Sequence, residues 1–318
     1  MFVAFTPVFV QAQRIGKDDL AALQKQEEVM KPTALKIIQG ISSKNRFEAD
    51  SLFTRQFVKA LTTKNSFYYT FDSLETISRL YAPDSSFKIF TWQMMISDNV
   101  IRQHGAIQMR TYDGSLKLYP LIDKSDVTQK IADTIGNNKG WIGAIYYRII
   151  QKKSSNKNYY TLIGYDENNI RSNKKIIEVL SFDNDEPVFG GRYFSFESDK
   201  TFKSSQSRYI MEYKKNASPR LNYDEELDMI IMEHLISESG KPNSKWTLVG
   251  DGDYEGFVWR NGKWIHVDKV FNQTTPMGKE PVPNPVRGDD GTIDEKKLKG
   301  AENDDVKPKT TIPKKKGN

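Results

Sequence analysis

The strongest constraint on the fold is a series of short segments between Phe67 and Val267 in which apolar and polar residues alternate. Alternation with a period of two places every second side chain on the same face of a β-strand. The 17 Phe, 15 Tyr and 5 Trp suit the half-buried surface of a sheet. Turn residues separate the segments at hairpin spacing, without the crossover helices that parallel strands require. We therefore predict a mainly β, α+β fold in which an antiparallel β meander forms a sandwich or an open barrel.

Residues 14–64 carry a different pattern, with apolar side chains at helical spacing. Pro32 predicts a kink or break in the first helix. Asn45 followed by Glu48 resembles a capping box, which predicts the start of a second helix. We expect this N-terminal helical pair to pack one apolar face against the β domain at residues 65–271.

Two local signals within the β domain give sharper expectations. Asp113-Gly114 is typical of a two-residue hairpin, and the resulting register would pair Met109 with Leu118. Residues 125–135 begin with polar capping residues and carry apolar side chains at helical spacing, so we predict a short helix there.

The two ends of the chain differ from its middle. Residues 1–13 contain no charge and end in Gln-Ala-Gln, which is typical of the apolar core and cleavage site of a secretory signal. The basic stretch that normally precedes such a core is missing, so we expect a truncated signal peptide and a start codon further upstream. A buried strand is the alternative. Residues 272–318 are rich in Pro, Lys and Gly and contain no aromatic residue, which predicts a disordered charged tail.

Composition excludes several classes of function. The net charge of +6 is spread along the chain rather than gathered in a basic stripe, which argues against nucleic-acid binding. The sequence has no Cys, hence no disulfide, thiol nucleophile or Cys-based metal site. It also lacks the glycine-rich motifs that hold nucleotide phosphates. No apolar run after the N-terminus is long enough for a transmembrane segment.

Four stretches, residues 66–72, 81–92, 159–166 and 254–264, are similar to a family of uncharacterised exported bacterial proteins. The resemblance covers roughly residues 18–270 and is a general pattern rather than a catalytic motif. It implies an extracytoplasmic location, periplasmic or extracellular, and supplies no activity, cofactor or site. The charged tail is not part of the family pattern.

The final hairpin has the sharpest local geometry. Asn261-Gly262 predicts a type I′ turn that pairs Trp259 with Trp264 and Phe257 with His266. All four side chains then share one face. We expect this face to belong to the core, with a ligand-binding platform for sugar rings as the alternative.

Asp251, Asp253 and Glu255 alternate with other residues in a glycine-containing segment that resembles the opening of a calcium loop. The twelfth position of an EF-hand loop requires Glu, and Gly262 stands there. An ordinary polar turn is therefore the favoured interpretation, and calcium the alternative.

The three histidines, His104, His234 and His266, have no spacing typical of a metal site. His234 beside Glu233 and His104 near Asp98 could act as acid–base pairs if a cleft brought them together.

A glycoside hydrolase would need two carboxyl groups about 5–9 Å apart. The candidates for such a pair are Glu178, Asp183, Asp185, Glu186, Glu225, Glu226, Asp228 and Glu233.

Taken together, these features predict an exported, envelope-associated binding or structural protein that is not an enzyme and needs no cofactor. Its expected partner is a glycan or another envelope component. Two alternatives stay open: an extracytoplasmic hydrolase that uses paired carboxylates on a polymer, and a calcium-stabilised adhesion-type module.

Overall fold

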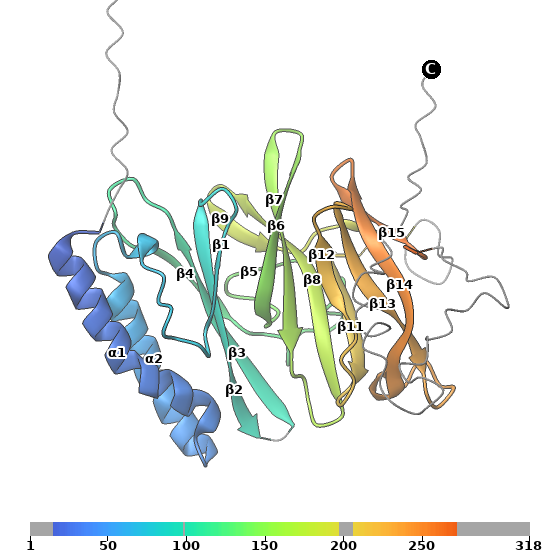
Figure 1. The fold of residues 1–318 in the computed structure, drawn as a ribbon, viewed down its shortest axis with the longest axis horizontal. Coiled ribbons are helices and arrows are strands. Elements are labelled where there is room, and N and C mark those ends of the chain that lie inside the picture. The colour runs from blue at the N-terminus through green and yellow to red at the C-terminus, as the bar shows by residue number, and fades with distance from the viewer. Residues whose placement is uncertain (1–14, 98, 197–205, 272–318) are drawn as a thin grey trace, which may run out of the picture. The chain divides into compact units, whose positions relative to one another are not determined.

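The computed structural model describes residues 15–97, 99–196 and 206–271, which lie within one compact unit, Met1–Phe271. Two α-helices, two short 3-10 helices, η1 (Ser66–Tyr68) and η2 (Lys245–Thr247), and three sheets form the regular elements of this part of the chain (Figure 1). The predicted signal peptide and the predicted tail lie outside the described residues. No described helix is long and apolar enough to cross a membrane.

The helical pair forms as predicted, with two local differences. Helix α1 (Lys17–Gln39) runs without interruption through Pro32, so the predicted break is wrong. Pro32 is exposed, and water can therefore satisfy the carbonyl group that its ring leaves unpaired. Helix α2 (Ser43–Leu61) is capped by Ser42, whose Oγ accepts a hydrogen bond from the Asn45 N–H at 3.2 Å. Asn45 thus lies inside the first turn rather than at the cap.

The strands form one four-stranded sheet and two larger sheets, and none of these closes into a barrel. Sheet A has the order β1-β2-β3-β4, sheet C the order β5-β9-β8-β7-β6 with β11 also on β8, and sheet D the order β10-β15-β14-β13-β12. All pairs between these strands are antiparallel except β10 with β15, which is parallel. In sheet A the strands are β1 (Ser78–Tyr81), β2 (Phe87–Ser97), β3 (Val100–Met109) and β4 (Lys117–Ile122). In sheet C they are β5 (Gly136–Asn137), β6 (Ile145–Ser154), β7 (Lys157–Asp166), β8 (Ser172–Asp183), β9 (Glu186–Phe189) and β11 (Arg208–Lys214). In sheet D they are β10 (Phe194–Ser195), β12 (Leu221–Asp224), β13 (Met229–Ser237), β14 (Leu248–Arg260) and β15 (Lys263–Val267).

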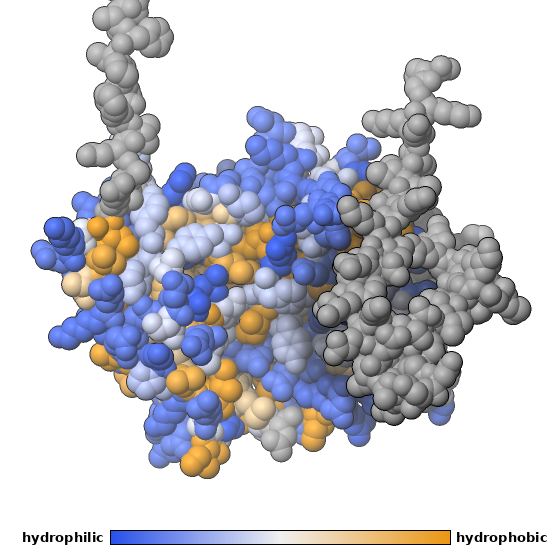
Figure 2. All heavy atoms as spheres, in the orientation of Figure 1, coloured by the Kyte–Doolittle hydropathy of each residue, from blue (hydrophilic) through white to orange (hydrophobic). Residues whose placement is uncertain are grey.

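The sheets stack behind the helices as successive layers, in the order helices, sheet A, sheet C and sheet D (Figure 1). One apolar core fills each of the three spaces between neighbouring layers. Alternation along each strand explains this arrangement, because sheets A and C direct apolar side chains to both faces. On the β2 strand, for example, Phe90 packs toward the helices and Ile89 toward sheet C. On the outer surface shown in Figure 2, apolar residues over the helical layer are scattered among hydrophilic ones.

The predicted turns have mixed outcomes. The β14–β15 hairpin has the predicted register, with Trp259 opposite Trp264. The register predicted at Asp113-Gly114 is wrong by one residue, because Met109 pairs with Lys117. Residues 125–135 form turns instead of a helix, and Lys130 there has a positive φ of 52°.

Lys88 is a fully buried lysine on the helix-facing side of β2, at 0% exposure. Its ammonium lies 4.3 Å from the ring centroid of Tyr81 and within 6 Å of three phenylalanine rings, and it donates to the Tyr69 carbonyl. Burial, with a smaller contribution from the nearby Arg79 charge, lowers the pKa of Lys88 to about 7. The aromatic rings and one carbonyl replace only part of the water that a lysine normally binds.

Lys88 should make stability rise with pH. Its pKa falls from 10.5 to about 7 on folding, so the unfolded chain binds more protons between these values. The free energy of unfolding should then increase by up to about 1.4 kcal/mol per pH unit above pH 7. Urea unfolding between pH 7 and about pH 9.5 measures the slope, which Lys88→Met should remove and Lys31→Met on the exposed face of α1 should keep. An equal slope in Lys88→Met would contradict this assignment.

Sheet C contains a buried ion pair between two of its own strands. Arg208 on β11 lies opposite Glu178 on β8, both side chains are 0% exposed, and Nε and Nη2 each lie 3.1 Å from Glu178 Oε2. The Tyr146 hydroxyl donates to the other carboxylate oxygen and accepts from the Trp141 indole at 2.7 Å. Burial, and then the Glu178 charge, raise the pKa of Tyr146 well above its ordinary value, which keeps this donor protonated.

Breaking this pair should be costly. Glu178→Gln leaves the Arg208 guanidinium buried without its counter-charge, so we expect the free energy of unfolding to fall by about 3–5 kcal/mol. The matched control is Glu225→Gln, which breaks the surface pair with Arg148 and should cost less than about 1 kcal/mol. Urea unfolding at one pH compares the two variants. Similar decreases in the free energy of unfolding would show that the buried pair contributes no more to stability than the surface pair.

Candidate functional site

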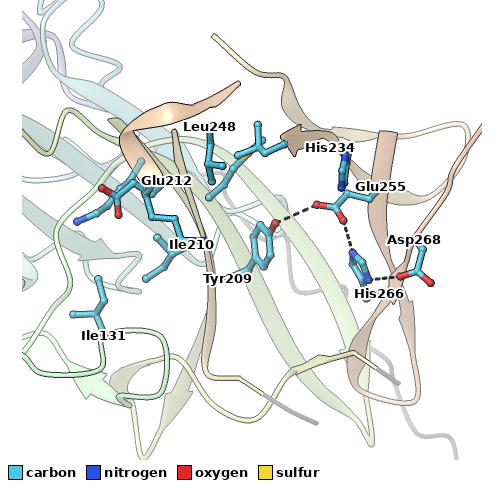
Figure 3. A pocket seen from close by; sticks show the side chains of 13 residues that line it. Ile131, Tyr209, Ile210, Glu212, His234, Leu248, Glu255, His266 and Asp268 are labelled. Atoms are coloured by element: carbon cyan, nitrogen blue, oxygen red, sulfur yellow. Dashed lines mark hydrogen bonds and ion pairs between the residues drawn. The ribbon is translucent and has the colours of Figure 1, made fainter. Parts of the chain in front are cut away.

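A cleft of about 590 Å³ opens between strand β11 and strands β13 to β15 of sheet D (Figure 3). Apolar side chains form part of its wall, and charged side chains from sheet D gather at one side of it. The lining residues are Ile131, Lys174, Tyr209, Ile210, Met211, Glu212, His234, Leu235, Lys245, Leu248, Glu255, His266 and Asp268.

Alternation along the final hairpin positions the polar wall of this cleft. Phe257 and His266 are cross-strand partners on β14 and β15, and their rings lie 5.2 Å apart. Two residues before Phe257 comes Glu255, and two residues after His266 comes Asp268, so both carboxylates continue the same face. This face is therefore apolar where it meets sheet C and acidic where it reaches the cleft.

His266 lies between two carboxylates. Its Nε2 is 3.0 Å from Glu255 Oε2, and its Nδ1 is 3.1 Å from Asp268 Oδ1 (Figure 3). The imidazole side chain is 4% exposed, that of Glu255 16% and that of Asp268 60%. The cluster thus runs from the interior to the surface, with Asp268 as its most accessible member.

Tyr209 connects the cluster to the edge strand β11. Its hydroxyl donates to Glu255 Oε1 at 3.3 Å. Burial, and then the Glu255 charge, raise the pKa of Tyr209 well above its ordinary value. The phenol therefore stays protonated and holds Glu255 from the side opposite His266.

A second histidine pair lies at the rim. His234 Nδ1 is 2.8 Å from Asp251 Oδ2, at a point where the β13–β14 register shifts. Burial alone would raise the pKa of Asp251, but hydrogen bonds from His234 and from the Asp253 N–H outweigh burial and lower it. Asp251 therefore carries its negative charge close to the cleft.

The predicted aromatic face forms, and it lies mainly in the core. Phe257 and Trp264 are both 0% exposed, and the Trp264 indole donates to Thr161 Oγ1 at 2.8 Å across the space between sheets C and D. Trp259 is partly buried and packs its ring 5.3 Å from that of Trp264. The two indoles therefore do not form a shared exposed platform, because burying them joins two sheets. Of the four predicted ligand-binding residues, only His266 lines the cleft.

The three carboxylates of the calcium-loop hypothesis point to different partners. Asp251 contacts His234, Glu255 contacts His266, and the nearest cation to Asp253 is Lys269, at 4.0 Å. Within the described ranges, no three His, Asp or Glu side chains come together in a way that could hold a metal ion.

The predicted acid–base pairs are replaced by others. His234 pairs with Asp251, whereas Glu233 accepts a hydrogen bond from the Arg220 N–H at 3.0 Å. His104 lies 3.5 Å from Asp50 on helix α2, which also accepts from the Trp92 indole at 2.8 Å. Asp98, the partner predicted for His104, lies outside the described residues.

None of the carboxylates considered for glycoside hydrolysis lines the cleft. Glu178 is buried against Arg208, and Glu233 binds a backbone N–H. The other six lie on exposed turns or strand ends, where three of them form surface ion pairs. These six are Asp183, Asp185, Glu186, Glu225, Glu226 and Asp228.

Sequence reasoning did not single out Tyr209 or Asp268. The position of Asp268, two residues after His266, was a usable signal, because the same face continues past the end of β15. Tyr209 could not be found this way, since the contact between β11 and β14 joins residues far apart in the sequence.

Comparison of the chain with protein families, with curated proteins and with solved structures finds no match. The resemblance to exported bacterial proteins therefore stays a prediction.

Proposed function

We propose that the protein is an exported, non-enzymatic binding protein of the cell envelope, and that the cleft beside β11 is its ligand site. One observation carries the proposal: three polar side chains, Glu255, His266 and Asp268, converge at one side of a cleft whose remaining lining mixes apolar and charged side chains. Ligand sites in proteins commonly combine an apolar cleft with a few fixed polar groups. Export is inferred from residues 1–13 and from the resemblance described above.

The arrangement favours binding over catalysis. Among the described residues that line the cleft there is no Ser, Thr or Cys, so these residues offer no hydroxyl or thiol nucleophile of these types. A carboxylate oxygen lies within 3.1 Å of each ring nitrogen of His266, and the ring is almost wholly buried. Both features limit the access of the imidazole to a substrate proton. The most exposed group of the cluster is the Asp268 carboxylate, at 60%, and a carboxylate binds a ligand by accepting hydrogen bonds from it.

A thermal-shift screen of the full chain should find the ligand class. The panel comprises cell-wall glycan fragments, basic and acidic peptides, and calcium with an EDTA control. A ligand at a hundred times its Kd stabilises the native state by about 2.7 kcal/mol, which appears as a higher melting temperature. The double variant Glu255→Gln with Asp268→Asn should abolish the shift, because it removes the accepting charges.

The matched control is Glu238→Gln, which removes an exposed carboxylate that pairs with Lys214 outside the cleft and should keep the full shift. Two results would contradict the proposal. One is the absence of a shift with any member of the panel, and the other is a shift of unchanged size in the double variant.

A further inference from the structure

Strand β11 has an open edge along the cleft. The Arg208 N–H donates to Ala132 O at 3.1 Å, away from β8, whereas the Lys215 N–H donates to Arg171 O at 2.9 Å, beside the start of β8. Alternate residues of an antiparallel strand direct both backbone groups to the same side, so Ile210 and Glu212 point away from β8. Within the described residues, no strand pairs with this side of β11 and no hydrogen bond is found for these four N–H and C=O groups.

The cleft follows this edge rather than one face of the strand. Tyr209 and Met211 line it from the face that packs toward sheet D, and Ile210 and Glu212 line it from the opposite face. Figure 3 shows Ile210 and Glu212 on one side of β11 and Tyr209 on the other. A ligand in the cleft therefore meets the unpaired backbone groups directly.

We propose that the ligand is an extended peptide of another protein that adds to β11 as an extra strand and presents a Lys or Arg side chain to Glu255 and Asp268. This inference rests on the proposed function and names its ligand class. Strand addition gains affinity from main-chain hydrogen bonds and specificity from pockets for alternate side chains. Ile210 and Glu212 together offer four main-chain groups to such a strand.

The negative charge on the sheet D side of the cleft favours a peptide with a Lys or Arg side chain. Among the described lining residues, strand β14 contributes Glu255 and the segment after β15 contributes Asp268, and Asp251 adds a further negative charge where it contacts His234. Two lysines also line the cleft, Lys174 from β8 and Lys245 from the short 3-10 helix η2 (Lys245–Thr247) between β13 and β14. A Lys or Arg side chain of the peptide that faces sheet D would donate hydrogen bonds to the Glu255 and Asp268 carboxylates. A Glu side chain at the same position would be repelled by their negative charge.

The direct test measures binding of blocked pentapeptides to the full chain by isothermal titration calorimetry. We expect Thr-Val-Lys-Val-Thr to bind, and Thr-Val-Glu-Val-Thr to bind roughly tenfold more weakly or less. Two N-methylated versions of the lysine peptide carry methyl groups on alternate backbone nitrogens. Only the version that blocks the nitrogens facing β11 should lose binding, because the other directs its methyl groups away from the edge.

The variant Ile210→Pro provides the matching change in the protein. It removes an N–H that points away from β8, so the β8–β11 ladder keeps its hydrogen bonds. We expect loss of lysine-peptide binding with a folded chain, as judged by a cooperative thermal transition. If this variant does not fold, the pair of N-methylated peptides decides alone.

The possible outcomes distinguish a failure of strand addition from a failure of the proposed function. Equal binding of both N-methylated peptides, or binding of a glycan but no peptide at Glu255 and Asp268, would overturn strand addition and leave the proposed function standing. Failure of every panel member to bind would overturn both. Equal affinity for the lysine and glutamate peptides would overturn the assigned charge preference.

Discussion

The arrangement of the whole protein depends on a central sheet that is buried on both faces. Sheet C packs against sheet A on one side and against sheet D on the other. A layer without a solvent face has no place for an unpaired charge, yet it contains Glu178 and Arg208 at 0% exposure. Their pairing, completed by Tyr146, satisfies both charges and fixes β11 beside β8.

The same arginine explains why a cleft exists next to β11. Its guanidinium also donates to the carbonyl groups of Ile131 and Thr134, the latter at 2.8 Å, and so holds the turns of residues 125–135 at one end of the strand. Those turns pair with the edge of β11 only at Arg208, through Ala132. Beyond that point no described strand pairs with the edge, and sheet D contributes Glu255 and His266 to the cleft beside it. A stabilising pair in the core thus sets the geometry of the proposed binding edge.

Local patterns predicted part of the local structure: the register expected at Asp113-Gly114 is wrong by one residue, whereas that of the final hairpin is right. The Asn261-Gly262 turn and the alternation around it were enough to predict the register of the final hairpin and the shared face of Trp264 and His266. Signals that depend on tertiary context were misleading: Pro32 stays inside α1 because it faces water, and residues 125–135 form turns held by Arg208. The cleft could not be predicted, since it requires knowing which sheets stack and which edge of β11 is free.

Strand addition at β11 requires that the outer edge of this strand is open in the free protein. Amide hydrogen exchange of the full chain, resolved by residue with NMR, tests this directly. We expect slow exchange for Met211 and Tyr213, whose N–H groups face β8, and fast exchange for Ile210 and Glu212, which alternate with them along the strand. Equal protection of all four amides would show that another segment already covers the edge, which would rule out strand addition there.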